Sequence, residues 1–108
     1  MNREELGKIA KVTLGSGGYQ EAMFGFSFEL KGEAWACGDF WGAWTNWSED
    51  CSWTMEDQTN TFVDSFYKVK HLMKEAKVDD FNDLIGKPVK VIFEGNRLSS
   101  WRILTEVL

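Results

Sequence analysis

The sequence predicts an α+β domain in which a mostly antiparallel sheet of about five strands carries one long helix and one short helix. Segments of alternating apolar and polar residues, typical of half-buried strands, occur in both halves of the chain. Between them lies a long segment whose apolar residues recur at helical spacing. The chain has one proline, Pro88, and no Ser/Gly-rich linker, so we expect residues 1–108 to form a single domain.

The composition excludes several classes of partner. A chain of 108 residues with 44% hydrophobic residues is long and apolar enough to bury a core. Its formal net charge of -5 offers no attraction for nucleic acid or for an anionic membrane, so we expect neither partner. The opening residues MNREEL contain no apolar signal segment, and no later segment approaches the length of a membrane span. We therefore expect Cys37 and Cys51 to be free thiols of an intracellular protein.

The first strand is predicted over residues 8–14, with Ala10, Val12 and Leu14 on one face. The glycine-rich segment 15–18 then interrupts it. Glycines permit positive φ and close backbone approach, which suits either a plain turn or an anion-binding nest. Without a Walker lysine and a following helix, the turn is the favoured interpretation.

Residues 22–30 predict the second strand, because one of its faces is almost wholly aromatic, with Phe24, Phe26 and Phe28. That face must pack on a helix or on another sheet. A tight turn at residues 31–32 leads to a third strand over residues 33–39, where Trp35 and Cys37 share one face and small residues line the other.

Residues 40–53 (FWGAWTNWSEDCSW) contain four of the six tryptophans, yet show neither strand alternation nor a helical stripe. They predict an irregular aromatic loop that must cover the core, a second copy of the chain, or a flat ligand. Strand 22–30 and the long helix already supply a core, so we expect the loop to serve a subunit interface, a ligand, or both. We place its ligand end at Phe40 and Trp41, and assign Trp47 and Trp53 to packing.

Thr54 predicts the start of the long helix, because Asp57 three residues later completes a capping box. His71 lies on this helix without a predicted partner, which favours a bystander role over a catalytic one. Val63, Tyr67 and Leu72 widen the apolar stripe enough to contact more than one surface, such as the sheet and a partner chain. The stripe itself is predicted to consist of Phe62, Phe66, Val69, Met73 and Ala76.

The C-terminal third predicts a short helix over residues 79–85, with Phe81, Leu84 and Ile85 facing in. Gly86 and Pro88 are expected to end this helix, and a hairpin follows. Strand 89–94 and strand 98–107 flank a turn at Gly95 and Asn96. Ser99 and Ser100 indicate a bulge in the last strand. On that strand we expect Trp101, Ile103, Thr105 and Val107 to share one face, with Arg102, Leu104 and Glu106 on the other.

No catalytic pattern is present in the sequence. There is one histidine, and there is no CxxC, HExxH or GxSxG motif. A zinc site would have to bring Cys37, Cys51 and His71 together from separate elements, and their spacing does not suggest one. We therefore expect no enzymatic activity, no cofactor and no metal.

Three features could build a binding site: an aromatic loop able to stack a flat base, a glycine loop able to present N–H groups to phosphate, and a hairpin with two arginines. Together they suit a nucleotide-like ligand. The alternative is that the tryptophans fill core and dimer contacts and that the arginines are solvated. The candidate ligand-binding residues are Gly17, Gly18, Tyr19, Gln20, Phe40, Trp41, Asn96, Arg97 and Arg102.

Residues 15–28 (GSGGYQEAMFGFSF), 38–44 (GDFWGAW) and 86–108 (ending in SWRILTEVL) resemble a family of small phage proteins, the first type of Thoeris anti-defence protein. The resemblance implies a non-enzymatic sponge in the host cytoplasm, which binds a cyclic ADP-ribose isomer made by bacterial TIR enzymes and withholds it from its effector. It also implies a homodimer or higher homo-oligomer with ligand recesses near the subunit interface, where aromatic and arginine side chains hold adenine and pyrophosphate.

Two alternative functions remain open from the sequence. The net charge of -5 and the tryptophans also suit an acidic phage inhibitor that binds a host defence protein directly, as anti-CRISPR-like factors do. A stoichiometric host protein recovered in a pull-down would favour that hypothesis. A small virion or assembly protein, whose tryptophans form only an oligomer interface, is the other, and it predicts that the chain is found in purified particles.

Overall fold

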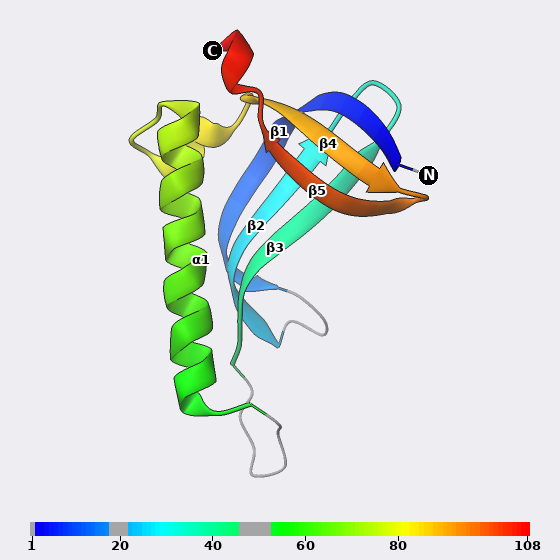
Figure 1. Ribbon diagram of the computed structural model, residues 1–108. Helices are drawn as coiled ribbons and strands as arrows, with labels where there is room; N and C mark the ends of the chain where they lie inside the picture. Colours follow the sequence, from blue (N-terminus) through cyan, green and yellow to red (C-terminus); the bar gives the residue numbers. More distant parts are fainter. Residues whose placement is uncertain (1, 18–21, 46–52) are drawn as a thin grey trace.

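The computed structural model describes residues 2–17, 22–45 and 53–108, and it confirms the α+β fold (Figure 1). The described strands form one antiparallel five-stranded sheet in the order β3-β2-β1-β4-β5. One long helix packs beside the sheet, and short 3-10 turns follow it and end the chain. The elements are β1 (Asn2–Gly17), β2 (Met23–Lys31), β3 (Ala36–Trp44), α1 (Met55–Ala76), η2 (Phe81–Leu84), β4 (Pro88–Glu94), β5 (Arg97–Ile103) and η3 (Thr105–Val107).

Strand β1 is the centre of the sheet and is longer than predicted. Residues 2–8 pair with β4, and residues 8–17 pair with β2. A bulge lies between Ile9 and Lys11, where the chain passes from one partner to the other. The extra residue shifts the alternation, so Ile9 and Val12 are both buried, and the prediction that Ala10 alternates regularly with Val12 and Leu14 is wrong because Ala10 is the unpaired residue. Leu14 shares the face of Val12, since they pair with Phe26 and Phe28, but Leu14 is 53% exposed.

The two edges of the sheet curl toward each other. Trp41 on β3 and Trp101 on β5 stack with ring centroids 5.5 Å apart and planes 14° from parallel. Both indole N–H groups donate to Oδ2 of Asp39, at 3.0 Å from Trp41 and 2.8 Å from Trp101. A flat sheet would hold its edge strands far apart, so these contacts show a strongly coiled sheet, close to a barrel (Figure 1).

The concave side of this sheet holds the hydrophobic core, which α1 and η2 help to close. Phe28 contacts both Trp41 and Trp101, and Trp35 meets Phe93 edge-on. The buried apolar residues of the sheet are Ile9, Val12, Phe26, Phe28, Leu30, Val89, Val91, Phe93 and Ile103.

The face that α1 turns to the sheet is rotated from the predicted stripe. Its buried residues are Ser65, Val69, Leu72 and Ala76, whereas Phe66 is 58% exposed. Ser65 can lie in the core because its hydroxyl donates to the Thr61 carbonyl at 2.8 Å. The predicted stripe was built from apolar residues alone, so it did not include Ser65 and did not locate the buried face of the helix.

Strand β3 corrects the prediction of a strand over residues 33–39 followed by an irregular loop from residue 40. The strand begins at Ala36 and continues to Trp44, which pairs with Met23. Gly42 has no side chain, so it interrupts the alternation of side chains by which a strand is recognised in the sequence, and the predicted strand was ended too early. Gly42 lies opposite Gly25, where a Cβ would meet the Trp41 carbonyl oxygen and come 2.5 Å from the Gly42 Cα. Within the aromatic segment, residues 46–52, including Trp47, lie outside the described residues.

The predicted start of α1 is confirmed. Thr54 caps the helix, and Asp57 completes the capping box. Lys77 ends it in the left-handed region at φ 60. The predicted short helix is the single 3-10 turn η2, capped by Asp80, and its expected inward residue Ile85 is 49% exposed.

The C-terminal hairpin follows the prediction as far as Ile103. Ile92 pairs with Ser100 and Phe93 with Leu98, so Ser99 is the extra residue of a bulge, as expected. Strand β5 stops at Ile103, and the expected continuation to residue 107 is wrong because Thr105–Val107 form a 3-10 turn.

Candidate functional site

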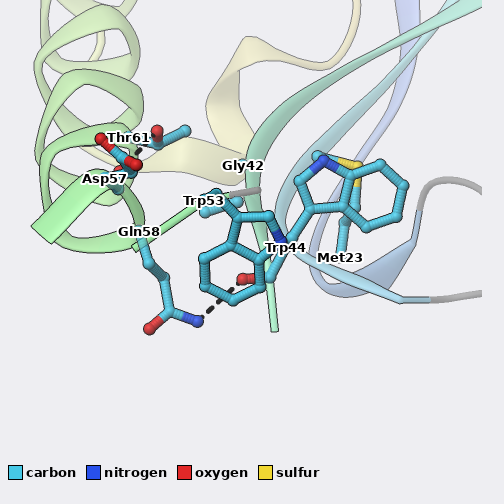
Figure 2. A pocket seen from close by; sticks show the side chains of 8 residues that line it. Met23, Gly42, Trp44, Trp53, Asp57, Gln58 and Thr61 are labelled. Atoms are coloured by element: carbon cyan, nitrogen blue, oxygen red, sulfur yellow. Dashed lines mark hydrogen bonds between the residues drawn. The ribbon is translucent and has the colours of Figure 1, made fainter. Parts of the chain in front are cut away.

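A cavity of about 230 Å³ lies where the end of β3 meets the first turns of α1 (Figure 2). Two indole rings border it, from Trp44 at the last position of β3 and from Trp53 just before the helix cap. The Trp44 side chain is 42% exposed, so the cavity opens to solvent beside it. The lining residues are Met23, Gly42, Ala43, Trp44, Trp53, Asp57, Gln58 and Thr61.

Strand pairing and helix capping position the two sides of this cavity. Met23 and Trp44 are paired neighbours at the ends of β2 and β3. Across the cavity, Gln58 Nε2 donates a hydrogen bond to the Trp44 carbonyl oxygen at 2.7 Å (Figure 2). This bond joins the first turns of the helix to the end of the strand, so the two walls are held as one unit.

The polar groups of the cavity belong mainly to the helix start. Asp57 Oδ2 accepts from the Thr54 backbone N–H at 2.8 Å, and the Thr61 hydroxyl donates to the Asp57 carbonyl at 2.8 Å. The Gln58 Oε1 accepts no hydrogen bond from the described residues. The cavity thus combines aromatic surface with one amide oxygen that can accept a hydrogen bond from a ligand.

The size of the cavity limits what it can hold. Pockets for complete drug-sized ligands enclose roughly 300–1,000 Å³. A volume of about 230 Å³ lies below that range and suits one flat ring system. Any remaining part of a larger ligand would extend out of the cavity past Trp44.

The structure describes only part of the predicted glycine-loop site. Gly18, Tyr19 and Gln20 lie outside the described residues. Gly17 is the last residue of β1 and pairs with Met23, which lines the cavity. Gly17 of the glycine-rich segment therefore lies next to a residue of the cavity wall.

Phe40 and Trp41, predicted as the ligand end of the aromatic segment, lie on opposite faces of β3. Trp41 faces the core with Phe28 and Trp101. Phe40 faces outward across the small Gly17, where a Cβ would come 2.6 Å from Phe40 Cε2. Because Phe40 and Trp41 lie on opposite faces of the strand, they cannot both line the same site on one face of the sheet.

The hairpin residues are not gathered at the cavity. Asn96 and Arg97 are exposed at the turn between β4 and β5, and neither lines the cavity. Arg102 donates to both carboxylate oxygens of Glu106, at 2.8 and 2.9 Å. This hydrogen bonding lowers the pKa of Glu106 to about 2. An anionic ligand at Arg102 must therefore compete with a carboxylate that is already bound.

Sequence reasoning missed Gln58, left Trp44 out of the candidate ligand-binding residues, and assigned Trp53 to packing. The signal that could have found the cavity is the capping box at Thr54. It fixes the start of the helix one residue after Trp53, which brings Trp53 and Gln58 to the same helix end.

Other candidate groups are separate from this cavity. His71 is exposed, with Nε2 3.6 Å from Glu75 Oε1. In the described part of the chain, no group of three or more His, Cys, Asp or Glu residues could hold a metal ion. No helix among the described residues is long and apolar enough to cross a membrane.

Comparison of the chain with protein-family models, curated proteins and solved structures gives no match. The function is therefore argued from the residues and the geometry of the site.

Proposed function

We propose that this chain binds a cyclic ADP-ribose-type immune signal made by bacterial TIR enzymes and sequesters it in the host cytoplasm without converting it. The chain would thereby block host anti-phage defence. The observation that carries the proposal is the cavity in which Trp44 and Trp53 face the same space beside the Gln58 amide. The sequence resemblance to the Thoeris anti-defence proteins supports the choice of ligand.

An adenine base suits this cavity by shape and by hydrogen bonding. It is flat, and stacking a base on an aromatic side chain contributes about 1–3 kcal/mol. Its exocyclic amine can donate to the Gln58 Oε1, which accepts no hydrogen bond from the described residues. Trp44 and Trp53 supply the aromatic surface on which it stacks.

The phosphates would lie outside the cavity, because about 230 Å³ holds a base and not a complete cyclic ADP-ribose. The glycine-rich segment is the proposed phosphate contact. Its Gly17 is the strand partner of the lining residue Met23, and glycine backbones can turn several N–H groups toward an anion. Arg97 and Arg102 remain proposed contacts, supplied where a second copy approaches.

Binding without conversion is supported by the engagement of the polar groups at the cavity. The Asp57 carboxylate accepts from the helix cap and the Thr61 hydroxyl donates to a backbone carbonyl. Among the described residues, neither contacts a histidine or another base that would activate it as a nucleophile.

Tryptophan fluorescence titrated with cyclic ADP-ribose isomers tests the proposal. Stacking on Trp44 should quench the emission, and heating the complex should release the isomer intact. A flat titration with every isomer, or recovery of a cleaved nucleotide, would contradict it.

Variants distinguish a ligand site in the cavity from a ligand site at Phe40. Trp44→Ala should weaken binding at least about tenfold, the equivalent of 1.4 kcal/mol. Leu6→Ala, which removes an exposed apolar side chain that lines no part of the cavity, should bind as the wild type does. A loss of binding in Phe40→Ala but not in Trp44→Ala would move the site to the outer face of β3.

A further inference from the structure

A groove of about 560 Å³ lies beside the second half of α1, away from the cavity of the candidate site. The chain turns back after the helix, so η2 lies beside α1 (Figure 1). Residues of α1, of β2 and of the segment that leads into η2 line this α1 groove, and none of them lines the cavity. Its volume falls within the roughly 300–1,000 Å³ of pockets that hold small molecules. The lining residues are Phe26, Phe66, Val69, Lys70, Met73, Lys74, Val78, Asp79 and Phe81.

Three phenylalanine rings supply the aromatic surface of the α1 groove. Phe26 of β2 is 5% exposed, and Phe66 of α1 meets it edge-on, with ring centroids 5.1 Å apart and planes at 90°. Phe81 of η2 meets the same ring at 5.3 Å and 67°. Phe66 is nevertheless 58% exposed, so part of its ring surface is open to a ligand. A flat aromatic group can cover this surface in the stacked or edge-on geometry that aromatic pairs prefer.

Two lysines border the same groove. Lys70 and Lys74 are one helical turn apart and therefore lie on the same side of α1. Both are exposed, and neither forms an ion pair with another described residue. The helix dipole favours a cation at Lys74 in the last turn, but this effect falls off before Lys70. Like charges at this spacing repel each other, and an anion bound between them would relieve the repulsion.

Asp79 is the one carboxylate among the lining residues. It forms no ion pair with Lys70 or Lys74. Two ammonium groups and one carboxylate leave the groove with an excess of positive charge, although the whole chain carries a formal net charge of -5. The groove therefore favours an anionic ligand over a cationic one.

We propose that the α1 groove binds a small aromatic carboxylate, with its ring against the three phenylalanines and its carboxylate between Lys70 and Lys74. The ring removes apolar surface from water, and the carboxylate accepts charge-assisted hydrogen bonds from the ammonium groups. This ligand does not compete with the proposed nucleotide, because the groove and the cavity share no lining residue. The proposal goes beyond the proposed function and does not depend on it.

An NMR titration with naphthoate and with its amide, naphthamide, tests the proposal. The two compounds have nearly the same shape, but only naphthoate is charged. Naphthoate should bind at least about threefold more tightly, a modest factor because the lysines are exposed. The backbone shifts should change around Phe66, Lys70 and Phe81. Absence of naphthoate binding overturns the proposal, as do equal affinities for the two compounds or shifts confined to Trp44 and Gln58 in the cavity.

Lysine variants test the role of charge. Lys70→Ser combined with Lys74→Ser should abolish the preference for naphthoate and leave the affinity for naphthamide unchanged. Lys8→Ser combined with Lys11→Ser removes the same charge from exposed residues that line no part of the groove, so it should keep the preference. Asp79→Asn should strengthen the binding of naphthoate alone, because it removes the one negative charge of the groove. A preference that survives without Lys70 and Lys74 overturns the proposal.

A pair of neighbouring helix residues tests the aromatic contact. Phe66→Ala should weaken the binding of both compounds at least about threefold, because it removes a ring that the ligand contacts. Tyr67→Ala removes the next ring along the chain, which is 66% exposed and lines no part of the groove, and should bind as the wild type does. Circular dichroism should show that both variants stay folded. Unchanged binding in Phe66→Ala overturns the proposal.

Discussion

Trp41 and Trp101 stand on the two edge strands of the sheet, yet their rings stack at 5.5 Å with planes 14° apart. The Asp39 carboxylate accepts a hydrogen bond from both indoles and from the Phe40 backbone N–H. Lys68 of α1 lies over the Trp41 ring, with Nζ 5.5 Å from its centroid. The two edges of the sheet are thus fastened by one carboxylate, and the helix covers the junction.

Replacing this carboxylate should destabilise the fold. Asp39→Ala removes the acceptor of two indole N–H groups and should cost about 2 kcal/mol, because hydrogen bonds to a charged group contribute about 1.5–3 kcal/mol. Urea unfolding followed by circular dichroism measures the loss. Asp64→Ala, which removes an exposed helix carboxylate that has no hydrogen-bond or ion-pair partner among the described residues, is the matched control and should change stability little. Equal stability of the two variants would show that the junction does not hold the edges together.

Two glycines that pair with each other in the sheet should respond oppositely to alanine. A Cβ at Gly25 would overlap the Trp41 carbonyl and press on Gly42, whereas a Cβ at Gly15 meets nothing within 4 Å. Gly25→Ala should therefore lower the free energy of unfolding by about 1–3 kcal/mol. Gly15→Ala should leave it unchanged or raise it by up to about 1 kcal/mol, because the unfolded chain loses freedom. Thermal unfolding of both variants decides, and similar melting temperatures would contradict the close approach of β2 and β3.

Element types were predictable where one local signal dominates. The capping box at Thr54 located the helix start, and Ser99 marked the bulge in β5. The failures share a physical cause, because each depends on a partner distant in the sequence. The bulge beside Ile9 arises where β1 changes partner from β4 to β2, and Ser65 faces the core only because the sheet lies beneath it.

The candidate site was only partly predictable for the same reason. Stacking chemistry in the aromatic segment followed from composition, but the choice of ring did not. Whether Trp41 or Trp44 faces a cavity depends on how far β3 extends and on which face the strand presents to the helix. Both are set by pairing with β2, where Gly25 and Gly42 allow close contact.

Cys37 should react slowly with alkylating reagents. Burial, followed by the neighbouring Asp39 carboxylate, raises the pKa of its thiol above the ordinary value of 9.0. The reactive thiolate is therefore scarcer at neutral pH than in an unfolded chain. In a Cys51→Ser background, the rate of reaction with iodoacetamide should rise with pH along a curve whose midpoint lies above 9.0, and unfolding in urea should restore an ordinary midpoint. A midpoint at or below the ordinary value would contradict this.

The ion pair of Arg102 and Glu106 should titrate only in strong acid. The Glu106 carboxyl has a pKa of about 2, against an ordinary 4.5, because the Arg102 guanidinium donates two hydrogen bonds to it. A depressed pKa stabilises the fold above pH 4.5, and that contribution is lost as the pH falls from 4.5 through about 2. Both side chains are solvent-exposed, so the effect on stability should be small. Carboxyl NMR titration should give a Glu106 pKa near 2 in the wild type and a pKa shifted up toward 4.5 in Arg102→Ala. If Arg102 binds the phosphate of a ligand, saturation with that ligand should raise the Glu106 pKa, because the guanidinium would exchange one anion for the other. An unchanged Glu106 titration in the saturated protein would exclude Arg102 from the ligand site.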